Sequence, residues 1–219
     1  RIFSAGGGSA LGGKFGGSSA AFDGNGDYLT VANNPDFDFG IDSFTIEAWI
    51  KIPDKTNYGA MTIASKYLPD SQGWIYQVDP RNAYKKLIIY QYNGQMTYVS
   101  PSANFEVNQW YHVAVTRSDS QLYFFVNGVL QGTQPAGSSG YNGGAASLKV
   151  GSYNNGPGEA ALFNGELDEL RISKGMARWT SDFASALPTQ EYTADSYTKL
   201  LLHMNGAEGA KDNIFICRG

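Results

Sequence analysis

Short apolar segments recur along most of the chain, and each one is bounded by Gly, Pro, Asn, Asp or Ser. Segments of this kind, rich in Val, Ile, Phe, Tyr and Trp, are typical of β-strands separated by turns. The pattern predicts strands at residues 20–22, 28–31, 44–52, 61–66, 74–78, 86–92, 96–100, 110–117, 122–128, 148–152 and 166–173. Many short strands at close spacing favour an all-β fold, an antiparallel two-sheet β-sandwich of the jelly-roll type.

The alternation of apolar and polar residues is clearest in FTIEAWIKI, residues 44–52. One face of this strand is expected to point into the core, because it carries Phe44, Ile46, Ala48, Ile50 and Ile52. The other face carries Thr45, Glu47, Trp49 and Lys51. This second face is either solvated or packed locally, or it lines a groove in which Trp49 stacks on a ligand.

Turn signals indicate where strands pair. Asn93-Gly94 and Asn127-Gly128 each separate two predicted strands, which predicts two-residue hairpins and an antiparallel sheet. Two long loops, beginning at Gly132 and Gly151, lack periodicity and contain Tyr141, Tyr153, Asn154 and Asn155. Loops on a rigid β scaffold often carry binding residues, although these loops also fit a plain role as surface connections.

The two ends of the chain differ from the middle. Residues 1–19 are rich in Gly and Ser and predict a flexible arm. Residues 20–192 are expected to form the domain, closing with a short helical or irregular segment that packs Met176, Trp179, Phe183 and Leu187 onto the sandwich. Residues 193–219 form an extension with one more apolar strand, which completes this sandwich, is donated to a neighbour, or starts another module.

Composition and charge argue against several kinds of protein. The formal net charge is −4 and no run of Lys or Arg occurs, so nucleic acid is not an expected partner. No stretch approaches the roughly 20 apolar residues of a membrane span. Cys217 is the only cysteine, so an intrachain disulfide is excluded.

Four segments in this order, AFDGNGDYLTV, FTIEAWIKI, WYHVAVTRSDSQLYFFVNGVL and FNGELDELRIS, resemble the laminin-G-like branch of the concanavalin A-like lectin/glucanase superfamily. The resemblance covers about Ala20 to Met176. It implies one convex and one concave antiparallel sheet, binding of glycans or proteins, often a structural calcium, and in some relatives hydrolysis of polysaccharides. The segments RISKGMARWTSDF and YTADSYTKLLLHMNG are also similar to modules of bacteriophage structural proteins and other large surface proteins.

The carboxylates of ELDEL allow two roles. Glu166 and Asp168 occupy alternate positions, as in the catalytic strand of the glucanases that the resemblance brings in, but Leu170 stands where a further acid is expected. This departure disfavours a hydrolase. If the first and last strands lie side by side, Asp168 and Asp27 can instead share a calcium ion with carbonyl groups near Gly24. Alternatively, the aspartates of DGNGD only close their own turn.

The histidines do not indicate a zinc site. His112 lies in WYHVAVTR, a strand that is apolar on both faces and therefore expected at the centre of a sheet. We expect both His112 and His203 to be hydrogen-bonded interior residues. Neither one has a second ligand at the spacing that zinc requires.

The sequence therefore predicts a noncatalytic recognition or structural module of a phage virion or of a secreted surface protein, located in the virion, outside the cell or at the cell surface. It would bind a glycan, such as a surface polysaccharide, or partner subunits. The expected glycan site consists of Trp49, Tyr141 and Tyr153 as stacking rings, with Asn154 and Asn155 bonding hydroxyl groups. One alternative is a polysaccharide-degrading glycoside hydrolase using Glu166 and Asp168. Another is a purely structural subunit that forms a homo-oligomer through its C-terminal strand.

Overall fold

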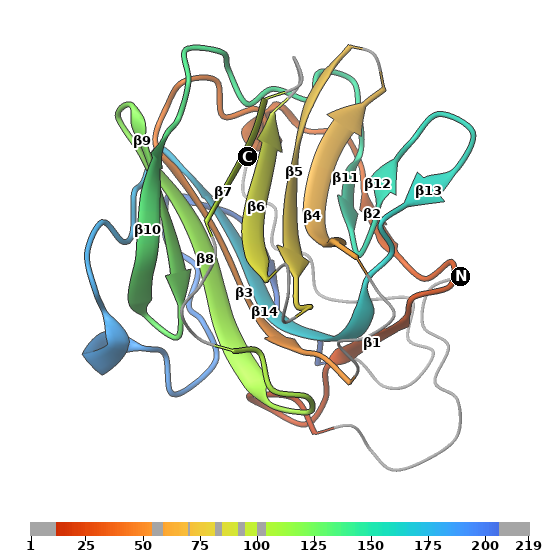
Figure 1. Ribbon diagram of the computed structural model, residues 1–219, viewed down its shortest axis with the longest axis vertical. Helices are drawn as coiled ribbons and strands as arrows, with labels where there is room; N and C mark the ends of the chain where they lie inside the picture. The colour runs from red at the N-terminus through yellow and green to blue at the C-terminus, as the bar shows by residue number, and fades with distance from the viewer. Residues whose placement is uncertain are drawn as a thin grey trace.

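Two antiparallel sheets pack face to face in the computed structural model, which describes residues 12–53, 59–69, 71–81, 85–91, 95–99 and 104–205 (Figure 1). Residues 95–99 are described by their backbone. The predicted Asn93-Gly94 turn and Cys217 lie outside the described residues. The predicted β-sandwich is confirmed.

The larger sheet has seven strands. Its order is β1 (Ala20–Asp23), β14 (Asn164–Lys174), β3 (Phe44–Lys51), β8 (Trp110–Ser118), β9 (Gln121–Val126) and β10 (Val129–Pro135), with β15 (Thr198–Leu202) also paired to β14. β1 pairs with the first part of β14 and β15 pairs with the second part. The two ends of the described chain therefore share one edge of this sheet.

The smaller sheet has six strands, in the order β2 (Leu29–Val31), β11 (Leu148–Val150), β4 (Met61–Leu68), β5 (Gln72–Asp79), β6 (Lys86–Gln91) and β7 (Gln95–Val99). A separate hairpin of β12 (Tyr153–Asn154) and β13 (Glu159–Ala160) lies beside β4 and β11 (Figure 1). The remaining elements of the described residues are two short 3-10 turns, η1 (Pro35–Phe37) and η2 (Ala184–Ala186).

The core lies between the sheets and follows the alternation of the strands. The core includes the apolar face of β3, from Phe44 to Ile50, and Ile52, which directly follows this strand. The smaller sheet contributes Trp74 and Tyr76 of β5, and Trp74 donates a hydrogen bond of 2.9 Å to the carbonyl oxygen of Phe37. Because alternate residues of a strand point to opposite faces, the polar residues of β3 lie on the outer side of the larger sheet.

The outer side of the larger sheet is itself covered by chain. After β14, residues 175–197 cross it, and Trp179, Phe183 and Leu187 pack against Phe125 and Ala114, as predicted. Met176, predicted to pack with them, is half-buried outside this cluster. The rings of Trp179 and Phe183 stack at 3.8 Å between centroids. Residues 12–19, here called the docked arm, also lie against this side, so this part of the expected flexible arm is packed. Phe15 of the docked arm contacts Trp49.

A β-bulge interrupts β14 between Asp168 and Arg171, where Glu169 has a φ of 51°. The extra residue breaks the strict alternation of the strand. Leu167, Leu170 and Ile172 remain in the core, while Asp168 and Glu169 lie next to each other outside it. Among the residues that the structure describes, no helix has the length and apolar character needed to cross a membrane.

Candidate functional site

The carboxylates of ELDEL are engaged in contacts within the protein. Glu166 forms an ion pair of 2.7 Å with Lys51 and accepts a hydrogen bond of 2.6 Å from the Ser19 hydroxyl. Asp168 is fully buried and accepts hydrogen bonds from the backbone N–H groups of Lys14 at 2.7 Å, Phe15 at 3.2 Å and Glu169 at 2.8 Å. A hydrolase needs an accessible acid and base, and the docked arm separates Asp168 from solvent.

The neighbouring charges form a buried network on the outer side of the larger sheet. Glu47 accepts hydrogen bonds from Arg171 at 2.7 and 2.9 Å and lies 3.1 Å from the His112 ring. Burial acts to raise the pKa of Glu47, but the hydrogen bond from His112 and the charge of Arg171 outweigh it and lower this pKa to about 2. The prediction that His112 is a hydrogen-bonded interior residue is confirmed. Glu169 pairs with His203 at 2.6 Å.

The structure does not bring Asp27 and Asp168 together. β1 and β14 do lie side by side, but Asp23 is opposite Asn164, four residues along β14 from Asp168, which is roughly 13 Å in a strand. Asp27 instead accepts a hydrogen bond from the Asp23 backbone at 3.3 Å, and Gly24 has the positive φ of a tight turn, 75°. The calcium site expected at Asp27, Gly24 and Asp168 is therefore not formed by these residues. Within the described ranges, no three His, Cys, Asp or Glu residues gather as metal ligands.

Two of the predicted stacking rings are buried. Trp49 is 4% exposed beneath Phe15, and Tyr141 is 1% exposed, with its ring 5.2 Å from that of Phe44. Tyr141 lies in a long loop, but it forms a β-bridge with Gly40, and this pairing brings its ring into the core. In this conformation neither ring offers a face to a ligand.

Tyr153 is half-buried and belongs to an aromatic cluster on the outer side of the smaller sheet. Its ring centroid lies 5.8 Å from that of Tyr67 on β4, and Tyr67 lies 5.9 Å from Tyr90 on β6. All three rings are half-buried. We call Tyr67, Tyr90 and Tyr153 the tyrosine face.

Tyr67 and Tyr90 are not among the predicted glycan-binding residues. Tyr67 is opposite Gly73 on β5, and Tyr90 is opposite Ile75 on the same strand. This register, which carries both rings to one side of the sheet, includes a bulge between Thr62 and Ala64. Tyr90 lies in the predicted strand 86–92, whereas Tyr67 comes one residue after the predicted strand 61–66. The side of the sheet on which Tyr67 lies depends on that bulge, and its closeness to Tyr90 depends on the pairing of both strands with β5.

Polar groups surround the tyrosine face. Lys149 on β11 forms an ion pair of 2.6 Å with Glu159, and its ammonium group lies 4.3 Å from the centroid of the Tyr28 ring. Asn154 and Asn155, predicted to bond sugar hydroxyls, shape the hairpin turn. The side chain of Asn154 accepts a hydrogen bond from the backbone of Gly156 at 2.9 Å, and the backbone N–H of Asn155 donates to Gly158 at 2.8 Å. The site thus combines aromatic rings, hydroxyls, amides and a neutralised charge pair.

Comparison with known proteins identifies the fold. The putative carbohydrate binding protein from Bacteroides ovatus has a TM-score of 0.64 at 21% identity, over 90% of this chain and 54% of that one. Domain 4 of the extracellular arabinanase AbnA from Geobacillus stearothermophilus, solved with arabinotriose, has a TM-score of 0.55 at 18% identity, over 73% and 71%. The Ruminococcus gnavus sialidase module CBM40, bound to α2,6-sialyllactose, has a TM-score of 0.52 at 11% identity, over 70% and 92%.

No curated protein matches the chain in sequence. The structural matches are too distant in sequence to carry more than the fold. A family profile described as "Concanavalin A-like lectin/glucanases superfamily", that of a laminin G domain, matches residues 23–179, which is well over half of the chain. The chain therefore belongs to the laminin-G-like domains of the concanavalin A-like lectin/glucanase superfamily.

Proposed function

We propose that this domain is a noncatalytic module that binds a glycan on the tyrosine face. The observation that carries the proposal is the contact of three half-buried tyrosine rings on the outer side of the smaller sheet. A tyrosine ring combines an apolar body with a polar hydroxyl. A sugar has the matching chemistry, with apolar C–H faces and hydroxyl groups at its edge.

The backbone supports a preorganised site. Tyr67 and Tyr90 stand on strands, and a β-carbon added to Gly73 would lie 2.5 Å from the Tyr67 Cα and 2.8 Å from its ring atom Cδ2. The Tyr67 ring therefore occupies space that a side chain at position 73 would fill. Side chains held in place before binding lose less conformational entropy when the ligand arrives, which favours affinity.

The structural relatives support the same class of ligand. One of them is named as a putative carbohydrate binding protein, and two others were solved with arabinotriose and with sialyllactose. We extend the proposal to the setting: a module of a virion or of a secreted surface protein, which would join a larger assembly to a surface polysaccharide or to partner subunits. A structural calcium ion would need ligands other than the Asp27 and Asp168 pair.

The test is Tyr67→Ala, compared with the parent chain on a glycan array and by calorimetry with arabinotriose and α2,6-sialyllactose. We expect the affinity for each bound glycan to fall about tenfold or more, since truncating a central interface aromatic costs more than about 1.4 kcal/mol. Tyr197→Ala is the control, because Tyr197 is 40% exposed and lies next to β15 of the other sheet. A parent chain that binds no glycan, or binding that Tyr67→Ala leaves unchanged, contradicts the proposal.

A further inference from the structure

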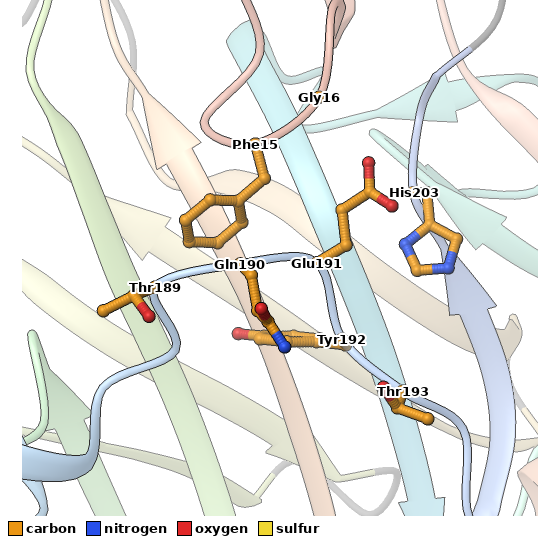
Figure 2. Close-up of a pocket in the computed structure, with 8 residues that line it drawn as sticks. All are labelled: Phe15, Gly16, Thr189, Gln190, Glu191, Tyr192, Thr193 and His203. Carbon is orange, nitrogen blue, oxygen red and sulfur yellow. The ribbon is translucent and has the colours of Figure 1, made fainter.

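A pocket of about 530 Å³ opens on the outer side of the larger sheet, on the opposite side of the sandwich from the tyrosine face (Figure 2). Three separate parts of the chain meet there: the docked arm, residues 189–193 and the residue that follows β15. The lining residues are Phe15, Gly16, Thr189, Gln190, Glu191, Tyr192, Thr193 and His203. Hydroxyl, amide and carboxylate groups therefore surround an aromatic interior.

The aromatic interior continues beneath the pocket. Tyr192 lies below Gln190 and is 6% exposed, and it packs in one cluster with Trp49 and Leu201 (Figure 2). The Arg171 guanidinium lies 4.3 Å from the centroid of the Tyr192 ring. Trp49 is thus buried beside the pocket and is not part of the core between the sheets.

Two polar atoms of this cluster have no partner outside it. The indole nitrogen Nε1 of Trp49 and the hydroxyl oxygen of Tyr192 are buried and face each other, and neither makes a hydrogen bond of normal geometry within the described part of the chain. Leaving a buried polar group unpaired is unfavourable, and native structures rarely do so. A ligand oxygen that reaches both atoms would recover this free energy.

Phe15 covers these rings. Its ring meets Trp49 edge-on at 5.7 Å between centroids, and the Lys14 ammonium group lies 4.2 Å from the Trp49 ring. Hydrogen bonds hold the docked arm in place. The backbone N–H groups of Lys14 and Phe15 donate to Asp168, and the hydroxyls of Ser18 and Ser19 donate to the Met204 carbonyl and to Glu166. Gly17 is exposed, and an added β-carbon there would meet no atom within 4 Å. The docked arm belongs to no strand of either sheet, so the Phe15 side chain can turn away from Trp49 while the strand pairing stays as it is.

We propose that this pocket is a second saccharide site, in which a sugar ring takes the place of Phe15 on Trp49. Sugar hydroxyls would pair with Trp49 Nε1 and the Tyr192 hydroxyl, and Thr189, Gln190 and Glu191 would bond the outer hydroxyls. An aliphatic ligand would leave the two buried atoms unpaired. The site shares no residue with the tyrosine face, so an experiment can refute one of the two proposed sites and leave the other unaffected.

The experiment places Phe15→Ala in a Tyr67→Ala background, which silences the tyrosine face. Methyl glycosides of glucose, galactose, mannose, xylose, arabinose and N-acetylglucosamine are titrated while NMR follows the Trp49 indole N–H, assigned with Trp49→Phe. We expect at least one glycoside to shift this signal, with an affinity about fivefold higher after Phe15→Ala, because the edge contact with Trp49 no longer competes.

Gln190→Ala provides a variant that leaves the docked arm intact, and we expect it to weaken the same binding severalfold. A thermal unfolding curve confirms that each variant folds. If none of the six glycosides shifts the Trp49 indole signal in either the Phe15→Ala chain or the Phe15 parent, the second site is refuted. The same holds if the signal shifts equally with Phe15 present or absent and with Gln190 replaced.

Discussion

Single residues on the outer side of the larger sheet have ionisation properties set by burial. Asp168 lies under the docked arm, and burial raises its pKa to about 7, although backbone N–H groups of Phe15 and Lys14 act in the opposite direction. The neighbouring charge of Glu169 raises it further. The fold thus disfavours the charged form of the carboxyl group that holds the docked arm.

Replacing Asp168 should change how stability depends on pH. The folded pKa of about 7 lies above the unfolded value near 3.9, so the contribution of Asp168 is fully present at low pH and is lost as pH rises through 7. We expect the free energy of unfolding of the parent to fall relative to that of Asp168→Asn between pH 4 and pH 8. Urea unfolding of both chains across this range measures the difference. Two parallel curves would contradict it.

At the scale of elements, pairing of β4 with β5 sets the position of the tyrosine face. Gly73 has a φ of 148°, and an added β-carbon would lie 2.6 Å from the Lys66 carbonyl oxygen as well as close to Tyr67. Both contacts involve backbone atoms, which cannot turn aside as a side chain can.

Gly73→Ala should therefore destabilise the domain by about 1–3 kcal/mol and weaken glycan binding in the same variant. The measurements are urea unfolding and calorimetry with a glycan that the parent binds. Gly158→Ala is the matched control in the neighbouring hairpin, because its added β-carbon meets nothing within 4 Å, and we expect a change within about 0.5 kcal/mol. Equal effects of the two substitutions on stability and on glycan binding would contradict the role given to the contacts at Gly73.

At the scale of the whole molecule, the two ends of the described chain complete one sheet. β15 pairs with β14 of its own chain, and its fully buried Leu200 belongs to the core between the sheets. β15 is therefore used within its own sandwich. If β15 were donated to a neighbour, the same edge of β14 would instead pair with β15 of another copy.

Leu200→Ala should lower the free energy of unfolding by about 2–5 kcal/mol, the usual effect of a buried cavity, without changing the molecular mass in solution. Urea unfolding and light scattering measure the two quantities. Lys199→Ala, half-buried on the same strand, is the control for stability. An oligomer of the parent chain that dissociates in Leu200→Ala would instead favour donation of the strand between copies.

The sequence by itself determined the fold class, the core face of β3, the packing of Trp179, Phe183 and Leu187, and the interior position of His112. These features follow from local periodicity and composition, which depend only on residues that are close together in the sequence. Only the tertiary structure decided that Phe15 covers Trp49, that Tyr141 enters the core, and that Asp27 lies apart from Asp168. It also decided that Tyr67 and Tyr90 join Tyr153. Each of these depends on register, on bulges or on a covering segment far away in sequence, and alternation within one strand carries no information about them.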